Sequence, residues 1–168
     1  MNRLQIPHCS LPQAMGEFII ADRNSFVISG THGKTTTTSM TSWILDQAGY
    51  QPGFLIGGIP KNFEKSFRNP ALNTFVIEGD EYDTAYFDKV PKFIHYKPQQ
   101  VILTSVEFDH ADIYKDLDHV KSAFRKLMDV FKVSEYKAFA TSAMREAKNG
   151  PEVISRIKKE ANIKIEII

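Results

Sequence analysis

The sequence predicts an α/β fold, a three-layer sandwich around a mostly parallel sheet with a P-loop, and two observations favour it. The first is a glycine-rich loop at 30–38 that joins a short run of β-forming residues at 26–29 to a helical pattern. The second is that two more apolar runs, 74–77 and 101–104, each lead directly into a polar cluster. Because α/β sheets bind ligands outside the carboxyl ends of their strands, we expect these clusters at one edge of one sheet.

Net charge, cysteine content and the length of apolar runs exclude several classes of protein. The chain has 168 residues and a net charge of +1, which argues against a nucleic-acid binder that tracks phosphates with basic runs. A single cysteine, Cys9, cannot form an internal disulfide and fits a reducing compartment. No apolar run approaches the roughly 18 residues that a membrane span needs. We therefore expect a soluble, cytoplasmic protein without a membrane partner.

The loop has the residues of a phosphate cradle. Gly30 and Gly33 allow a tight turn whose amide groups point into one concavity, and the helix that follows adds the positive end of its dipole. Lys34 supplies a cation for phosphates, and the Thr35 hydroxyl is placed to hold magnesium. The spacing is the shorter Gly-x-x-Gly-Lys-Thr form, because the full motif needs glycine where this chain has Ile28. An ordinary strand-to-helix turn is the alternative, but it gives no reason for Lys34.

The first half of the chain is predicted as follows. Residues 1–25 form an irregular lead-in with a short helix from Pro12 to about Phe18. A short strand at 54–56 ends at two glycines, and 60–73 is a surface excursion. The helix after the loop is expected to end near Gly49 and to pack an apolar face on the sheet, formed by Met40, Trp43, Ile44 and Ala48.

Carboxylates follow the strand at 74–77 without a spacer. The run is Glu-Gly-Asp-Glu-Tyr-Asp at 78–83, and its first residue, Glu78, is placed to hold a metal opposite the loop. An acidic run is otherwise a solvated loop. His110 ends the polar cluster after the strand at 101–104, where it is a candidate metal ligand or proton carrier.

Five ordered motifs over about residues 5–125 resemble the central domain of the Mur ligase family. They are Gly-Thr-His-Gly-Lys-Thr-Thr-Thr-Thr at 30–38, Phe-Leu-Ile-Gly-Gly at 54–58, Glu-Gly-Asp-Glu-Tyr-Asp-Thr-Ala-Tyr-Phe-Asp-Lys at 78–89, Lys-Phe-Ile-His-Tyr-Lys-Pro at 92–98 and Val-Glu-Phe-Asp-His-Ala-Asp-Ile-Tyr at 106–114. His32 resembles the muramate-acting branch. The third and fourth motifs are similar to the members that recycle a murein tripeptide onto UDP-N-acetylmuramate.

The resemblance implies an ATP-dependent amide ligase of peptidoglycan recycling that works through an acyl phosphate, with ATP and Mg²⁺ as cofactors. Its substrates would be UDP-N-acetylmuramate and a murein tripeptide, and its oligomeric state stays open. Thr35 and Glu78 would ligate one magnesium and His110 would serve a second, so that Lys34, Glu78 and His110 are the expected catalytic residues. The nucleotide would contact Gly30, Thr31, His32, Gly33, Lys34, Thr35 and Thr36.

Two positions depart from the family pattern. Several relatives use a carbamylated lysine where this chain has Arg125, which cannot be carbamylated. The muramate branch also tends to have asparagine after the third strand, where this chain has Thr104 and Ser105. We expect the part at 1–125 to be an incomplete central domain without its flanking domains.

The tail at 126–168 resembles a different family, the exopolyphosphatases and guanosine-pentaphosphate phosphohydrolases. The resemblance depends on Ala-Thr-Ser-Ala-x-Arg-Glu-Ala-x-Asn at 140–149, and Arg145 is expected on a helix surface. The pattern predicts a strand at 137–141, a helix from Pro151 to about Ala161 and a strand at 163–168, which together could pack on the same sheet. Two alternatives to the ligase therefore remain, a phosphohydrolase fragment and a non-catalytic nucleotide-binding module.

Overall fold

The computed structural model describes residues 7–105, 122, 125 and 128–168. The chain divides into two compact units, Met1–Phe131 and Lys132–Ile168, which are described separately below. In the described parts of the chain, no helix is long and apolar enough to cross a membrane.

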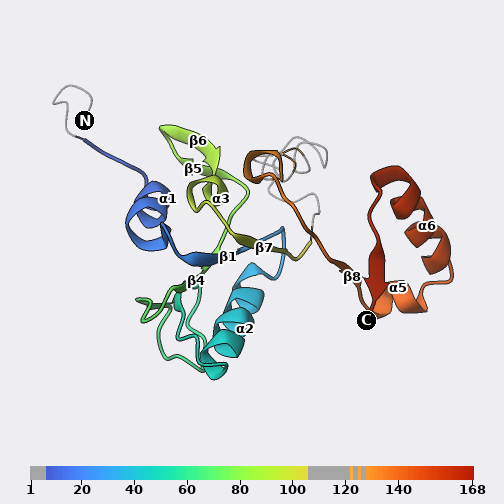
Figure 1. The fold of residues 1–168 in the computed structure, drawn as a ribbon, viewed down its shortest axis with the longest axis horizontal. Helices are drawn as coiled ribbons and strands as arrows, with labels where there is room; N and C mark the ends of the chain where they lie inside the picture. Colours follow the sequence, from blue (N-terminus) through green and yellow to red (C-terminus); the bar gives the residue numbers. More distant parts are fainter. Residues whose placement is uncertain (1–6, 106–121, 123–124, 126–127) are drawn as a thin grey trace. The chain divides into compact units, whose positions relative to one another are not determined.

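A five-stranded sheet forms the centre of the first unit (Figure 1). Its order is β3-β2-β4-β1-β7, and β1 pairs in parallel with both β4 and β7. β2 joins β4 in parallel, whereas β3 pairs with β2 in the antiparallel direction. The predicted α/β fold with a mostly parallel sheet is therefore confirmed. The strands are β1 (Asn24–Ser29), β2 (Gly53–Leu55), β3 (Phe67–Arg68), β4 (Thr74–Glu78) and β7 (Gln100–Leu103).

Side chains alternate between the two faces of β1 and β4, and each face has its own apolar cluster. One face carries Val27 and Ile77, which pack with helical residues from the lead-in and from α3 (Lys92–His95); the buried members are Ile20, Val27, Phe75, Ile77, Phe93 and Tyr96. The other face carries Ile28 and Val76, with Leu45 of α2 (Lys34–Gln47) against it; its buried members are Ile28, Phe54, Ile56 and Val76. Figure 1 shows α2 on one side of the strands and α3 on the other, which gives the three layers.

Two short segments complete the first unit. The lead-in forms α1 (Leu11–Ala14) and the single-turn π-helix η2 (Met15–Ile20), and the Ser10 hydroxyl caps α1 by accepting from the N–H of Gln13. After β4 the chain forms a small antiparallel hairpin of β5 (Asp83–Ala85) and β6 (Asp88–Pro91).

The buried face of α2 differs from our prediction. Met40 and Ile44 are 58% and 61% exposed, whereas Thr38 and Ser42 are fully buried. The expected face of Met40, Trp43, Ile44 and Ala48 is therefore wrong. Small hydroxyl residues let the helix approach the sheet closely, and the Thr38 hydroxyl is satisfied by donating to the carbonyl of Lys34 at 2.8 Å.

The second unit has the predicted strand, helix and strand. These are β8 (Ala138–Ala140), α6 (Gly150–Ala161) and β9 (Ile165–Ile167), with a short helix α5 (Ser142–Glu146) after β8. β8 and β9 pair in parallel and form a two-stranded sheet within this unit. Along α6 the predicted inward residues are half-buried, namely Val153, Ile154 and Ile157.

Candidate functional site

The glycine loop follows β1 and ends at the first turn of α2. Gly30 and Gly33 have φ values of +125° and +79°, which side chains with a Cβ rarely adopt, so both positions need glycine's freedom. A Cβ on Gly30 would also collide with the Thr104 hydroxyl. Gly33 is the N-cap of α2, and the amide groups of the next residues have no carbonyl partner inside the helix. A glycine loop that leads into a helix N-terminus in this way presents amide groups that could hold an anion.

The residues after β7 hold this loop in place. Ser105 accepts from the N–H of Thr31 through its carbonyl at 3.0 Å and from the N–H of His32 through its hydroxyl at 3.1 Å. The Thr104 hydroxyl donates to the carbonyl of His32 at 2.5 Å. Sequence analysis noted Thr104 and Ser105 only as departures from a family pattern, because no sequence signal shows a contact across two parallel strands. The amides of Thr31 and His32 are engaged here, which leaves the amides that begin α2 as those that could hold an anion.

Lys34 lies back over its own loop. Its ammonium donates to the Gly30 carbonyl at 2.7 Å and to Glu81 Oε2 at 3.3 Å, and Asp80 Oδ1 lies 3.7 Å away. Glu81 is only 1% exposed, which is rare for a carboxylate and requires a compensating partner. The sequence predicts a metal-binding role within the acidic run for Glu78 and does not single out Glu81. The sequence has no signal that distinguishes Glu81 from its acidic neighbours, because it stands beyond the end of β4 at Glu78 in a run of acids.

Thr35 and Glu78 come together as predicted. The Thr35 hydroxyl donates to Glu78 Oε2 at 3.1 Å, and the N–H of Gly57 donates to Glu78 Oε1 at 2.7 Å. One carboxylate and one hydroxyl at the carboxyl ends of β4 and β1 make a pair of hard oxygen donors. Magnesium typically uses one or two carboxylates together with phosphate oxygens and water, so this pair fits that ion. Among the described residues no three His, Cys, Asp or Glu side chains gather as a complete metal site.

A second lysine extends the charged group away from the loop. Lys92 donates to Asp80 Oδ2 at 2.8 Å and lies 4.6 Å from the centre of the Tyr82 ring. Burial alone would lower the pKa of Lys92, but the hydrogen bond and charge of Asp80 raise it above its ordinary value. Asp80 therefore lies between the ammonium groups of Lys34 and Lys92. Burial raises the pKa of Tyr96, and the charges of Asp80 and Tyr82 add to this effect.

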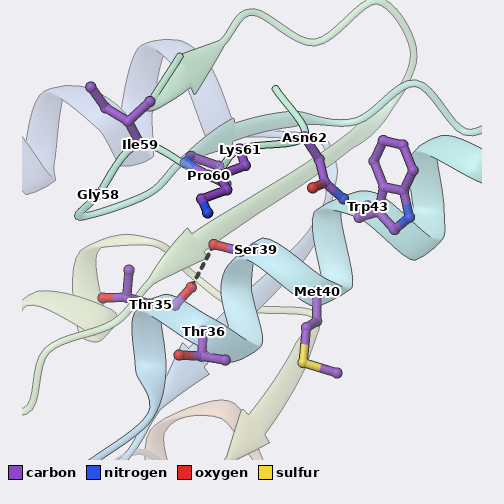
Figure 2. A pocket seen from close by; sticks show the side chains of 10 residues that line it. All are labelled: Thr35, Thr36, Ser39, Met40, Trp43, Gly58, Ile59, Pro60, Lys61 and Asn62. Carbon is purple, nitrogen blue, oxygen red and sulfur yellow. Dashed lines mark hydrogen bonds between the residues drawn. The ribbon is translucent and has the colours of Figure 1, made fainter. Parts of the chain in front are cut away.

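A cavity of about 660 Å³ opens beside Thr35 (Figure 2). One wall is the first half of α2, with Met40 and Trp43, and the opposite wall is the segment after β2, with Ile59 and Lys61. In Figure 2 the Ser39 hydroxyl donates to the Thr35 carbonyl at 2.7 Å on the helix wall. Met40 and Trp43, two apolar side chains that α2 does not bury against the sheet, therefore form part of this wall. The full lining is Thr35, Thr36, Ser39, Met40, Trp43, Gly58, Ile59, Pro60, Lys61 and Asn62.

The structure thus brings Lys34, Thr35 and Glu78 together at one edge of the sheet, where Thr36 borders the cavity. His110, the remaining predicted site residue, lies outside the described residues, and its role stays a prediction. Arg145 donates to the carbonyl of Ile168 at 2.9 Å in the second unit, in keeping with its expected place on a helix surface.

Comparison with known proteins identifies relatives of this chain. The Mur ligase middle domain matches residues 28–166. The UDP-N-acetylmuramate--L-alanyl-gamma-D-glutamyl-meso-2,6-diaminoheptandioate ligase of Escherichia coli (strain K12) is 51% identical over 125 residues, which are 74% of this chain and 27% of that protein. The enzyme of the same name from Haemophilus influenzae is 47% identical over 123 residues, 73% of this chain and 27% of that protein. The chain therefore spans about a quarter of these relatives' length.

Solved structures agree with these matches. The UDP-N-acetylmuramate:L-alanyl-gamma-D-glutamyl-meso-diaminopimelate ligase from Neisseria meningitides has a TM-score of 0.75 and 38% identity, covering 99% of this chain and 52% of that one. A murein peptide ligase from Psychrobacter arcticus 273-4 has a TM-score of 0.71 and 33% identity, covering 99% and 36%. Since the middle-domain match continues to residue 166, the comparisons give no support to the exopolyphosphatase resemblance of the tail.

Proposed function

The chain belongs to the Mur ligase family, and from this membership we propose that its glycine loop binds the phosphates of ATP for amide bond formation. The observation that carries the proposal is the meeting of Lys34, Thr35 and Glu78 at the ends of two parallel strands. This is the edge at which α/β sheets bind ligands.

The proposed reaction joins a murein tripeptide to UDP-N-acetylmuramate, as the names of the relatives from Escherichia coli and Neisseria meningitides suggest. The lactoyl carboxylate takes the γ-phosphate of ATP and becomes an acyl phosphate, while ADP leaves. The peptide amine then attacks the acyl carbon, and inorganic phosphate leaves as the amide forms. Such chemistry depends on positioning and charge neutralisation more than on a strong acid or base.

Each loop residue has a proposed task in this reaction. The amides at the start of α2 and the side chain of Thr36 face the phosphates, and Lys34 neutralises the β- and γ-phosphates. Thr35 and Glu78 are the residues that would hold magnesium, which supplies charge neutralisation when bound. Gly30, Thr31, His32 and Gly33 shape the loop around them. His110 is proposed to serve a second magnesium.

The cavity beside Thr35 is the place we propose for the acceptor carboxylate. Its helix wall starts at the residue that contacts Glu78, so an occupant at this end would lie next to the transferred phosphate. The two walls combine apolar side chains with hydroxyl, amide and ammonium groups, which suits a sugar derivative. Both substrates are small molecules, and we place the reaction in the cytoplasm, where Mur ligases work.

Calorimetric titration of the purified chain with Mg-ATP tests the proposal. We expect saturable binding that Lys34→Gln weakens at least about tenfold, because a charge-assisted contact to phosphate is lost. Glutamine is chosen because its amide can still donate to the buried Glu81, so that the fold keeps this contact. Lys65→Gln, at an exposed position, is the matched control and should leave binding unchanged.

Binding without amide product after addition of both substrates would identify the chain as a nucleotide-binding part of a larger ligase. Equal affinity of the wild type and Lys34→Gln would contradict the phosphate loop. Thermal unfolding of each variant, measured in parallel, separates a lost contact from a lost fold.

A further inference from the structure

The ammonium of Lys34 is enclosed by acceptors of its own chain. An ammonium group has three N–H donors. The Gly30 carbonyl at 2.7 Å and Glu81 Oε2 at 3.3 Å lie within or near hydrogen-bonding distance. Asp80 Oδ1, at 3.7 Å, lies at the distance of an ion pair without a hydrogen bond. A phosphate that enters the loop must therefore replace at least one of these acceptors.

The two carboxylates beside Lys34 differ in burial. The side chain of Glu81 is 1% exposed, so withdrawing the Lys34 ammonium from this buried carboxylate costs free energy that solvation by water does not offset. The side chain of Asp80 is 17% exposed and has a second cation, because Lys92 donates to its other oxygen at 2.8 Å. Moving Lys34 away from Glu81 therefore requires more free energy than moving it away from Asp80.

We infer that Glu81 is a positioning residue that holds the Lys34 ammonium at the glycine loop, and that Asp80 is the contact Lys34 releases when phosphate arrives. The inference rests on the proposed function only where it invokes the phosphate; the hold of Glu81 on Lys34 does not need a ligand.

This arrangement has a physical benefit for binding. A lysine side chain has four rotatable bonds, and fixing it in one conformation costs conformational entropy. Glu81 fixes the ammonium before the ligand arrives, so the ligand does not bear that entropy cost. Lys92 keeps the charge of Asp80 compensated after the exchange, so Asp80 still has a cation beside it.

Nuclear magnetic resonance of the ligand-free chain tests the hold directly. Lysine ammonium protons give a resolved ¹H–¹⁵N correlation when they are held by acceptors and exchange slowly with water. We expect such a signal for Lys34, assigned by its loss in Lys34→Gln. It should disappear in Glu81→Gln and persist in Asp80→Asn, which should instead lose the signal of Lys92.

Persistence of the Lys34 signal in Glu81→Gln, together with its loss in Asp80→Asn, would reverse the two roles and overturn the inference. Glu64→Gln, at an exposed position, is the matched control for removal of one carboxylate. Backbone amide spectra report whether each variant is folded. If Glu81→Gln does not fold, the double variant Lys34→Gln/Glu81→Gln decides, because it should fold if the unpaired ammonium caused the damage.

Mg-ATP titration tests the second part of the inference, that Lys34 releases Asp80 when phosphate binds. Glu81→Gln should weaken binding about tenfold, and this effect should vanish in the Lys34→Gln background, as expected for two residues that act through each other. Asp80→Asn should tighten binding by up to about fivefold, since it removes a competitor for Lys34 in a partly exposed pair. Tighter binding by Glu81→Gln, or an equal effect in both backgrounds, would show a carboxylate that only repels phosphate. A wild type that binds no Mg-ATP would contradict the proposed function, whereas the ammonium signals would still decide whether Glu81 holds Lys34.

Discussion

At the scale of single residues, Glu78 shows how one carboxylate links three segments. It accepts from the Thr35 hydroxyl at the start of α2 and from the N–H of Gly57 after β2, while it ends β4 itself. The residue is therefore oriented by two donors before any ion is present.

Glu78→Gln is expected to reduce the magnesium dependence of ATP binding more than it reduces the affinity without metal. The amide keeps the shape of the side chain but removes the negative charge that attracts the ion. The stimulation of binding by magnesium should fall by at least about tenfold in a magnesium titration of nucleotide affinity. Glu64→Gln is the control, and identical magnesium curves for wild type and Glu78→Gln would exclude Glu78 from the site.

Tyr96 predicts a loss of stability at alkaline pH. Burial first, and the charges of Asp80 and Tyr82 second, raise the pKa of its phenol in the folded state. A phenol in the unfolded chain ionises near pH 10, so the folded state is favoured below that pH and loses this advantage as the pH rises above it. At pH 11 the wild type should therefore have lost about 1.4 kcal/mol more of its free energy of unfolding than Tyr96→Phe.

Urea unfolding at pH 8 and at pH 11 measures this difference. Tyr50→Phe, at a position that is 53% exposed, is the matched control for removal of one phenol. Parallel losses in the wild type and Tyr96→Phe would show that Tyr96 does not cause the alkaline destabilisation.

The sequence predicted the residues of the glycine loop better than it predicted which acid of the run at 78–83 is buried. Lys34, Thr35 and Glu78 follow from their spacing after predicted strands, and the structure places them together. The inward turn of Glu81 did not follow, because an acidic run has no periodicity that marks which carboxylate is buried. In the structure the Lys34 ammonium lies 3.3 Å from Glu81 Oε2 and supplies a counter-charge that helps to stabilise the buried carboxylate.

At the scale of elements, the strands were predictable and the orientation of α2 was not. Short apolar runs before polar clusters identified β1, β4 and β7. For β1 and β4 the physical reason is that parallel strands covered on both faces are continuously apolar. β7 lies at the edge of the sheet, and its apolar side chains are exposed. For α2, the prediction that apolar residues face the sheet identified the wrong side of the helix, because Met40 and Ile44 are exposed. Thr38 and Ser42 face the sheet instead, since close packing there depends on small size.

Ser42→Ala is expected to stabilise the protein. The Ser42 hydroxyl is buried and has no hydrogen-bond partner among the described residues, and alanine is the better helix former. We expect a gain of about 0.5–1 kcal/mol in the free energy of unfolding, measured by urea denaturation. Thr38→Ala is the contrast, because it removes a hydroxyl that donates to the Lys34 carbonyl and should destabilise the protein. A loss of stability in Ser42→Ala would show that its hydroxyl has a partner.

At the scale of the whole molecule, the two compact units meet in the sequence at Phe131 and Lys132. Phe131 is partly buried and packs against the apolar cluster that contains Ile20 and Phe93. This contact belongs to the first unit.

Truncation after residue 125 should therefore destabilise the first unit, whereas truncation after residue 131 should preserve it. Loss of a partly buried phenylalanine costs about 1–3 kcal/mol, and thermal unfolding should shift by several degrees. Phe131→Ala in the full chain is the matched control and should produce a similar shift. Equal melting temperatures for the two truncations would show that Phe131 adds nothing to the core.

The charged groups around the loop have a consequence for how the site responds to salt. Three carboxylates, Glu78, Asp80 and Glu81, lie with two ammonium groups, Lys34 and Lys92, so this group is slightly negative in a chain whose net charge is +1. Such a site does not attract a polyanion from a distance, and the free triphosphate is repelled by the surplus carboxylate. The affinity for the free triphosphate should therefore not fall as ionic strength rises, and it should increase slightly, because salt screens this repulsion.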